Sequence, residues 1–339
     1  MTTGNRAGGV GVNRGASSAA VNDLFLQLTP DKILDAVEVG GLRATGRAMQ
    51  LNSYENRVYD VEMEDESHRV LKFYRPGRWS REAIQDEHRF LRALLTDGMP
   101  VAAAEPLRPG DPESTLGEIA GILYASFPKV RGRLLLADEL SDDLLRSIGR
   151  LLGRLHNVGE EEAAPHRPRL SPGSYALDEL DFLCTRFVPL SLATRYRAAA
   201  ARVASAAAAL AELPVLRIHG DCHLGNLLFT SSGPCFVDFD DFLNGPAVQD
   251  LWLLAGGDAD RFAERLAALC EGYEDLRHLP RGSLQLCEAL RGLRMLRYAA
   301  WLGHRYHDPA FQRAFPDFES ERFWQREVDD LERQVARLP

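Results

Sequence analysis

The chain has 339 residues, of which 45% are hydrophobic, and it carries a formal net charge of -9 at pH 7. This length and apolar content predict a globular protein of about two domains. The acidic balance argues against polyanionic partners, so we expect neither nucleic-acid binding nor attraction to an anionic membrane. No stretch approaches the roughly 18 apolar residues that a membrane span requires.

Cysteine content and the first residues bear on the cellular compartment. The five cysteines form no Cys-x-x-Cys pair, and their odd number argues against a disulfide framework. A reducing cytoplasm suits such a set, and we predict a cytoplasmic protein. Residues 1–22 are rich in Gly, Ser and Asn and lack the apolar core of a signal peptide, which predicts a disordered tail.

The next segment, residues 23–127, predicts a small first lobe. Thr29, Pro30 and Asp31 are typical of a helix start, and Gly40 follows the expected end of that helix. Short apolar or alternating runs then predict strands at residues 51–54, 57–63, 69–74 and 119–127.

A lysine in the third of these strands has a candidate partner. Lys72 alternates with Leu71 and Phe73, so its side chain points to the opposite face of the sheet. An isolated strand lysine is usually solvated. A lysine that pairs with a helix carboxylate, however, holds the nucleotide phosphates in kinases.

The helix that follows supplies such a carboxylate. Ser80 predicts the cap of a helix that runs to about residue 95, with Glu87 on its apolar side and Asp86 in water. A carboxylate on a packed face is costly unless it is paired, and Lys72 is the natural partner of Glu87. The alternative is a surface lysine beside an ordinary amphipathic helix.

The second part of the chain, residues 128–339, predicts a mainly helical lobe. Helices are expected at residues 138–157, 193–213, 248–254, 284–304 and 319–337. Together with the strands of the first part, this pattern predicts an α+β fold with a small antiparallel sheet in one lobe and mostly helices in the other.

Residues 215–241 predict two short strands with acid-bearing turns. Asp221 and Asn226 are five residues apart, as in the kinase catalytic loop, and Asp238 follows Asn226 by twelve. Phosphoryl transfer needs an Asp that faces the acceptor hydroxyl, and an Asn and a second Asp that bind magnesium. We therefore predict Asp221 and Asp238 as catalytic residues, Asp221 being the base, with Asn226 and Asp238 as ligands of Mg²⁺ and with ATP as co-substrate.

Two other interpretations of this loop remain open. Asp and Asn are common in turns for conformational reasons alone. The side chains of His219, Asp221, Cys222 and His223 are also possible transition-metal ligands, although no distant His or Cys cluster completes such a shell.

Five motifs then identify a resemblance to a known family. They are NSYENRVY at 52–59, KFYRP at 72–76, HGDCHLGN at 219–226, FVDFDD at 236–241 and NGPAVQDLW at 244–252. As a set they resemble the bacterial stress-response kinase A family, the RdoA type, which belongs to the aminoglycoside phosphotransferase and choline kinase branch of the kinase-like fold. The resemblance extends from about residue 24 to residue 330.

This resemblance implies a two-lobed, protein-kinase-like fold and an ATP- and magnesium-dependent serine/threonine protein kinase of the stress response. Its substrates would be proteins with Ser or Thr acceptors, including itself as a phosphoprotein. The alternative is a small-molecule kinase that acts on an amino alcohol, an aminoglycoside or a related metabolite. A nucleotide-binding scaffold without turnover is a third hypothesis, and Asp221 argues against it because a scaffold needs no base.

The resemblance also implies residue roles. Ser53 would contact the nucleotide in the phosphate loop, Lys72 and Glu87 would hold the phosphates, and Asp250 would brace the catalytic loop. The phosphate loop departs from the wider kinase pattern because it has no glycines, and Asp238 is followed by Phe-Asp instead of Phe-Gly.

The acceptor side of the site also gives an expectation. Asp238, Asp240 and Asp241 predict a preference for neutral or basic acceptors, and Asp240 is a candidate auxiliary metal residue. The loop at 160–175 and the C-terminal helices are expected to shape the acceptor cleft.

Overall fold

The structure is a computed structural model that describes residues 24–25, 27–256 and 260–339. The predicted tail at residues 1–22 lies outside the described residues. The chain divides into two compact units. Unit 1 comprises the described residues of Met1–Arg89, Ala103–Lys129 and Pro165–Pro168, and unit 2 comprises those of Phe90–Ala102, Val130–Ala164 and Arg169–Pro339.

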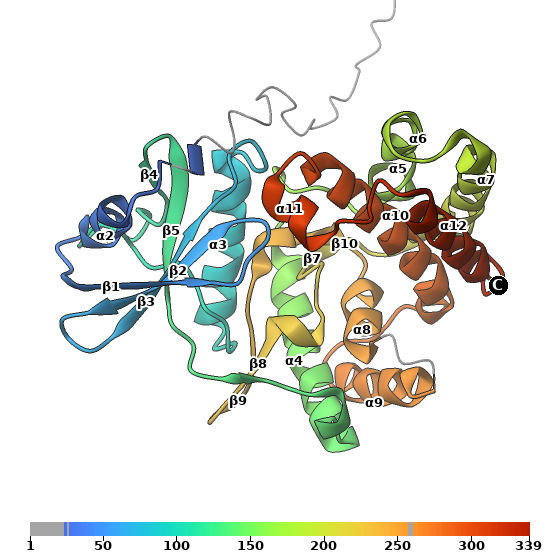
Figure 1. Ribbon diagram of the computed structural model, residues 1–339. Coiled ribbons are helices and arrows are strands. Elements are labelled where there is room, and N and C mark those ends of the chain that lie inside the picture. Colours follow the sequence, from blue (N-terminus) through green and yellow to red (C-terminus); the bar gives the residue numbers. More distant parts are fainter. Residues whose placement is uncertain (1–23, 26, 257–259) are drawn as a thin grey trace, which may run out of the picture. The chain divides into compact units, whose positions relative to one another are not determined.

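Unit 1 contains a five-stranded antiparallel sheet (Figure 1). In spatial order its strands are β1 (Ala44–Leu51), β2 (Arg57–Met63), β3 (His68–Phe73), β5 (Ile122–Pro128) and β4 (Gly117–Ile119). The predictions for 57–63 and 69–74 are confirmed to within one residue at each end. The prediction of a strand at 51–54 is wrong: β1 ends at Leu51, and its middle is exposed, so no buried alternation marks it in the sequence.

The predicted strand at 119–127 is a hairpin of two strands. Its turn is formed by Ala120 and Gly121, whose φ angles are 51° and 76°. Both values lie in the left-handed region that two-residue hairpin turns require. The apolar character of the segment is continuous across the turn, which explains why the sequence suggested a single strand.

One face of the sheet is covered by helix α2 (Pro30–Glu38), which starts at the predicted position. Thr29 Oγ1 caps the helix by accepting from Lys32 N at 3.4 Å. The helix buries Ile33 and Val37 in the apolar cluster that contains Leu71 and Phe73. Because side chains alternate along a strand, this packing turns Lys72 to the other face of the sheet.

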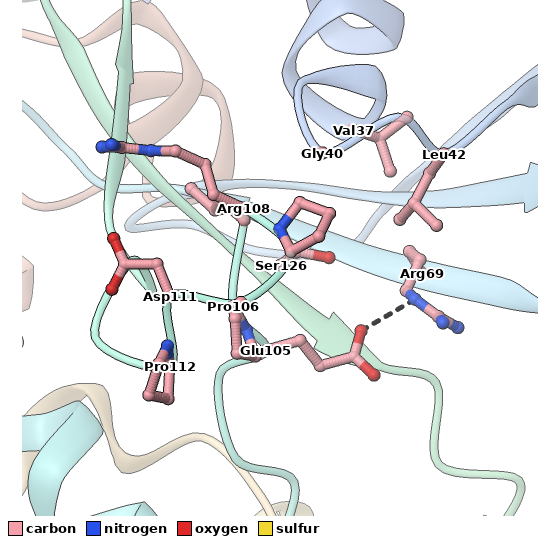
Figure 2. A pocket seen from close by; sticks show the side chains of 13 residues that line it. Val37, Gly40, Leu42, Arg69, Glu105, Pro106, Arg108, Asp111, Pro112 and Ser126 are labelled. Carbon is pink, nitrogen blue, oxygen red and sulfur yellow. Dashed lines mark ion pairs between the residues drawn. The ribbon is translucent and has the colours of Figure 1, made fainter.

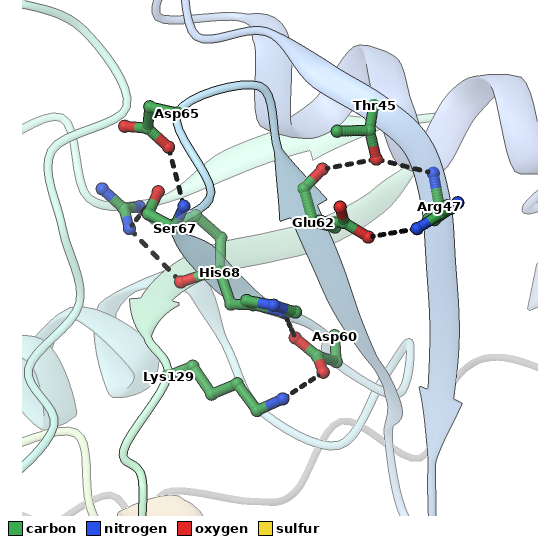
Figure 3. Close-up of polar contacts among 9 residues, drawn as sticks. Thr45, Arg47, Asp60, Glu62, Asp65, Ser67, His68 and Lys129 are labelled. Carbon is green, nitrogen blue, oxygen red and sulfur yellow. Dashed lines mark hydrogen bonds and ion pairs between the residues drawn. The ribbon is translucent and has the colours of Figure 1, made fainter.

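That other face also carries a small polar network (Figure 3). Asp60 on β2 accepts from His68 Nδ1 at 2.8 Å and pairs with Lys129, which directly follows β5. Burial raises the pKa of Asp60, but the bonds from Lys129 and His68 lower it more, so the carboxyl stays ionised. The network ties the end of the sheet to the segment that leaves it.

Helix α3 (Arg81–Thr96) follows the prediction closely. Ser80 Oγ accepts from Ala83 N at 3.2 Å, which confirms the predicted cap. The expectation that Asp86 lies in water is wrong, because the side chain is buried and accepts from His166 N at 2.9 Å. Residues 165–168 belong to unit 1 and cover this side of the helix, a contact between distant segments that helical periodicity cannot reveal.

Unit 2 is mainly helical, as predicted. Its larger helices are α4 (Asp142–Glu161), α7 (Leu190–Ala206), α8 (Val248–Ala255), α9 (Phe262–Glu274), α10 (Cys287–Arg305) and α12 (Glu321–Val335). Shorter helices are α5 (Pro172–Tyr175), α6 (Leu180–Arg186) and α11 (Pro309–Ala314). Two small sheets, β7 (Leu216–Ile218) with β10 (Leu243–Gly245) and β6 (Arg133–Leu134) with β8 (Leu227–Thr230) and β9 (Gly233–Phe236), complete the unit.

Helices α4 and α9 approach each other closely through glycines. A Cβ atom at Gly149 would lie 2.1 Å from Leu269 O, and one at Gly272 would lie 1.9 Å from Arg146 O. Both obstacles are backbone oxygens, which cannot rotate away as a side chain can. The two helix backbones therefore touch only because these positions have no side chain.

The described residues also bear on membranes and disulfides. None of their helices is both long and apolar enough to cross a bilayer. All five cysteines have free thiols.

We predict that Gly149→Ala and Gly272→Ala each destabilise the protein by about 1–3 kcal/mol. Alanine gains about 1 kcal/mol over glycine in a helix, but the clash with a backbone oxygen outweighs this gain. The free energy of unfolding from chemical denaturation is the measurement. Gly173→Ala is the control, because its nearest new contact is an ordinary 3.7 Å. Unchanged stability in both variants would contradict the close approach of the helices.

Candidate active site

The predicted catalytic loop, residues 219–226, links β7 to β8 in unit 2. It turns sharply at Gly220, which has a φ of 80°. A Cβ atom there would lie 2.5 Å from Asp241 O, so both the conformation and the space require glycine. The loop thereby brings its polar residues next to the acidic turn that follows β9.

A buried carboxylate on α8 holds the first residues of the loop. Asp250 is 0% exposed, and its two oxygens accept from His219 N at 2.8 Å and Gly220 N at 2.9 Å. It also bonds to His156 Nε2 at 3.1 Å. Three donors around one carboxylate compensate the cost of burying it. The bracing contact that the resemblance implied for Asp250 is confirmed.

Further residues that no sequence motif had indicated support this brace. His156 Nδ1 lies 3.1 Å from the Tyr273 hydroxyl, which fixes the ring behind Asp250. Gln249 donates to Gly220 O at 3.1 Å, so both backbone groups of the glycine are held. The only sequence signal for His156 is a polar residue within an apolar helix face, and that signal does not name its partner.

Asp221 is surrounded by donors. Its Oδ1 accepts from Arg294 Nη1 at 2.6 Å, and its Oδ2 lies 3.3 Å from His223 Nε2. Burial raises the pKa of Asp221, but the His223 hydrogen bond and the Arg294 charge lower it more, so the pKa lies well below its usual range. The carboxylate is therefore ionised at any physiological pH. Arg294, on α10, had no signal in the catalytic motif.

A hairpin brings Asn226 and Asp238 together. In its register Leu227 opposes Phe236, and Val237 N donates to Asn226 O at 3.0 Å. The residue after this bond is Asp238, which is exposed and has a φ of 60°. A left-handed conformation is uncommon for a residue other than glycine, although Asp tolerates it better than most.

These two residues fit a magnesium ion. Asn226 Nδ2 donates to Asp221 O at 3.0 Å, which orients the amide so that its oxygen is available as a ligand. One amide oxygen and one exposed carboxylate are a suitable donor set for Mg²⁺, which keeps several waters and phosphate oxygens in its shell. Asp240, the candidate auxiliary residue, is buried.

A transition-metal site fits the loop less well. His219 Nε2 bonds to Val237 O at 3.0 Å, and burial raises the pKa of the Cys222 thiol well above its ordinary value. A neutral buried thiol is a poor ligand. Within the described ranges, no group of three His, Cys, Asp or Glu side chains is placed to bind a metal.

In unit 1, the predicted pair of Lys72 and Glu87 is present. Lys72 Nζ lies 3.5 Å from Glu87 Oε1, and Glu87 is 1% exposed. The ammonium group also lies 5.0 Å from the centre of the Tyr74 ring, within cation–π range. Strand β3 and helix α3 thus hold the charged end of Lys72 in place.

The predicted phosphate loop contains Ser53, whose hydroxyl accepts from Asn56 N at 3.3 Å and closes a turn. Asn56 Oδ1 accepts from Arg75 N at 3.0 Å, and Arg75 Nε donates to Glu55 O at 3.0 Å. Side-chain bonds to the segment after β3 therefore stabilise this loop, which has no glycines.

A separate pocket of about 480 Å³ lies elsewhere in unit 1 (Figure 2). Its lining includes Arg69, Glu105 and Ser126, and Arg69 Nε pairs with Glu105 Oε2 at 2.7 Å. Arg69 and Ser126 lie on the sheet face opposite Lys72, because Ser126 pairs with Leu71 in the register. The pocket is therefore distinct from the face that carries the predicted nucleotide residues.

The chain is similar to known phosphotransferases and kinases. Residues 48–284 match the model of the phosphotransferase enzyme family. The chain is 39% identical over 307 residues to stress response kinase A of Escherichia coli K12, covering 90% of this chain and 92% of that protein. The serine/threonine protein kinase RdoA of Salmonella typhimurium is also 39% identical, with the same coverage.

Solved structures with a similar fold include kinases that are named for small molecules. Amicoumacin kinase hAmiN, in complex with AMP-PNP and Ca²⁺, superposes with a TM-score of 0.72 at 18% identity and covers 91% of this chain and 96% of its own. A microcompartment-associated aminopropanol kinase has a TM-score of 0.67 at 21% identity, with coverage of 92% and 100%. At these identities the likeness supports the kinase-like fold alone. The family match and the 39% identity over most of the chain show that this chain belongs to the phosphotransferase enzyme family and, within it, to the stress response kinase A group of ATP-dependent kinases.

Proposed function

We propose that the protein is a cytoplasmic serine/threonine protein kinase of the stress response, which transfers the γ-phosphoryl group of Mg·ATP to Ser or Thr hydroxyls of proteins, itself included. The supporting observation is the similarity over 90% of the chain to a kinase named for serine/threonine protein substrates. The braced loop with Asp221 and Asn226 agrees with it.

In this proposal Asp221 orients the acceptor hydroxyl and takes its proton. The bond from the hydroxyl oxygen to the γ-phosphorus forms while the bond from that phosphorus to the bridging oxygen of ADP breaks. A carboxylate with a lowered pKa is a weak base, so it accepts the proton late. Such timing suits the loose transition state of phosphoryl transfer, in which positioning contributes more than proton abstraction.

The other predicted residues would bind the metal ion and the negatively charged phosphates of the nucleotide. Asn226 and Asp238 would hold Mg²⁺, which neutralises negative charge on the phosphates when bound. Ser53 would contact the nucleotide from its turn, and Lys72, oriented by Glu87, would pair with phosphate oxygens. Asn226, Ser53 and Lys72 already bond to neighbouring residues, so little ordering of these three side chains remains to be done on binding.

A small-molecule kinase is the second candidate. The observation in its favour is the fold likeness to kinases named for amicoumacin and aminopropanol. The same transfer machinery would serve an amino-alcohol hydroxyl. The acceptor surface, and not the catalytic loop, must therefore discriminate between protein and small-molecule substrates.

We expect the protein to label itself and a general protein substrate on Ser or Thr from radiolabelled ATP, and Asp221→Asn to lower this rate by roughly 10²-fold or more while ATP binding persists. Phosphoamino-acid analysis and a nucleotide-binding assay are the measurements. Asp143→Asn is the matched control, since that side chain is 98% exposed. Rapid turnover on an amino alcohol without any protein labelling would support the second candidate instead.

We predict that Asn226→Ala and Asp238→Asn raise the magnesium concentration needed for half-maximal activity, because each removes a metal-binding oxygen or its charge. Asn is chosen at position 238 because it tolerates the left-handed backbone there. The measurement is a magnesium titration at fixed ATP. The metal must be bound elsewhere if both midpoints equal that of the unaltered protein.

We predict that Lys72→Met lowers kcat/KM strongly and that Glu87→Gln acts in the same direction but less. Glu87→Gln keeps the shape of the side chain, and Lys72→Met shortens it by one atom, so the main change in each variant is the loss of charge. The double variant should lose less than the sum of the single losses in activation free energy, since the two residues act as a pair. Additivity within about 0.5 kcal/mol would show that they are not coupled.

A further inference from the structure

The proposed base of the reaction is paired with an arginine from a distant helix. Arg294 Nη1 donates to Asp221 Oδ1 at 2.6 Å, and the Arg294 side chain is 41% exposed. A guanidinium has five N–H donors in a planar fork, and this contact uses one of them. Arg294 is therefore accessible to solvent and able to bind a second anion beside Asp221.

A second arginine lies one turn further along α10. Arg297 stacks over the Tyr175 ring, with its Cζ atom 5.5 Å from the ring centre. Burial raises the pKa of the Tyr175 hydroxyl, and the charges of Arg297, Asp241, Arg294 and Asp221 all act on it. Tyr175 thus lies in one cluster of unit 2 that contains both arginines, the proposed base and Asp241.

The charge of Arg297 is not neutralised locally. Within the part of the chain that the structure describes, no carboxylate lies within 4.0 Å of its guanidinium, whereas Arg294 has only Asp221. The chain as a whole carries a net charge of -9. Among the charged groups around Tyr175, Arg297 is thus a guanidinium without a carboxylate in contact, and Arg294 keeps donors that its bond to Asp221 does not use. Such groups would attract an anionic group of the substrate.

We infer that the acceptor is anionic: the Ser or Thr hydroxyl that Asp221 orients belongs to a polypeptide segment with Asp or Glu side chains next to the acceptor, and Arg294 and Arg297 bind these carboxylates. This inference rests on the proposed function. Guanidinium groups bind carboxylates in a bidentate manner, which gives direction as well as attraction.

This inference reverses the expectation of neutral or basic acceptors. That expectation rested on Asp238, Asp240 and Asp241, but Asp240 is buried and Asp238 is a proposed ligand of the metal. The charge of Asp240 is therefore not presented to an incoming substrate, and Mg²⁺ would compensate that of Asp238. Asp241 is partly exposed and lies in the cluster around Tyr175 together with the two arginines. The arginines of α10 come from a segment that the local sequence around the acids does not reveal.

Binding of an acidic segment also affects Asp221 itself. In the structure, Arg294 contacts the Oδ1 atom and His223 faces the Oδ2 atom of this carboxylate. An acceptor hydroxyl needs one of the two oxygens. A substrate carboxylate that binds the remaining donors of Arg294 would draw the guanidinium toward itself and weaken its bond to Oδ1. That oxygen would then be available to the hydroxyl, so the acidic group would act on turnover as well as on binding.

The test uses the full-length protein and three peptides that share one Ser acceptor and differ only in the flanking residues, which are Glu, Gln or Lys. We expect kcat/KM for the Glu peptide to exceed that for the Gln peptide by roughly tenfold, as charge-assisted hydrogen bonds allow. Higher ionic strength should reduce this ratio. Equal rates for the three peptides, or faster transfer to the Lys peptide, would overturn the inference.

Substitutions in α10 test whether Arg294 and Arg297 cause the preference for the Glu peptide. Arg297→Gln should lower the Glu-to-Gln ratio several-fold with little change for the Gln peptide, and Arg297→Glu should turn the preference toward the Lys peptide. Arg294→Gln should lower the ratio and also kcat. Arg322→Gln, an exposed arginine in the first turn of α12, is the matched control and should keep the ratio. A preference that survives in Arg297→Glu would contradict the assignment.

Assays with small-molecule acceptors distinguish an error in this inference from an error in the proposed function. If no peptide is phosphorylated, the same variants are tested on small hydroxy acids and on amino alcohols. Turnover of hydroxy acids that Arg297→Glu abolishes would retain the anionic acceptor and reject the protein substrate. Turnover of amino alcohols alone would reject both the protein substrate and the anionic acceptor. Protein labelling without a charge preference would reject only the anionic acceptor.

Discussion

The hydrogen bonds from His219 N and Gly220 N to the buried Asp250 carboxylate are the contact on which the proposed catalytic site depends. They fix the start of the loop, and the loop then fixes Asp221 and Asn226. A carboxylate in this position is stable only because His156 supplies a third donor and because the first turn of α8 favours negative charge. The site is thus supported by a polar cluster that never contacts solvent.

The residue that holds the loop in place is buried, whereas the residues proposed to react are accessible to solvent. Asp250 is fully buried, whereas Asp221 and Asn226 are half-buried and Asp238 is exposed. Asp221 and Asn226 lie on a loop whose start is held by charge-assisted bonds, and Asp238 lies in the turn that the β8–β9 hairpin brings beside that loop. Such preorganisation is the main way in which a protein lowers the barrier of phosphoryl transfer, because the reaction itself needs little covalent help.

The acceptor side raises a different physical question. Family members named for stress response and fold neighbours named for antibiotics or amino alcohols have kinase-like architecture in common, so the fold does not determine the substrate. In this chain α10 places Arg294 against the proposed base and Arg297 beside Tyr175. Cationic side chains at this point would select among hydroxyl-bearing substrates by charge, while the transfer machinery remains the same.

The sequence by itself determined the features that short-range patterns encode. The spacing of Asp221 and Asn226, the alternation that turns Lys72 away from Leu71, and the Ser80 cap of α3 depend on residues that are close in the chain, and turn chemistry and side-chain periodicity are local. The predicted pairing of Lys72 with Glu87 could be reached in the same way, because strand, turn and helix are consecutive.

Only the tertiary structure decided the contacts between distant segments. Arg294 is 73 residues from Asp221, Tyr273 is 117 residues from His156, and His166 covers Asp86 from 80 residues away. No periodicity links such positions. Their proximity follows from the way in which whole helices pack, including the glycine contacts of α4 and α9, and that packing is a property of the complete chain.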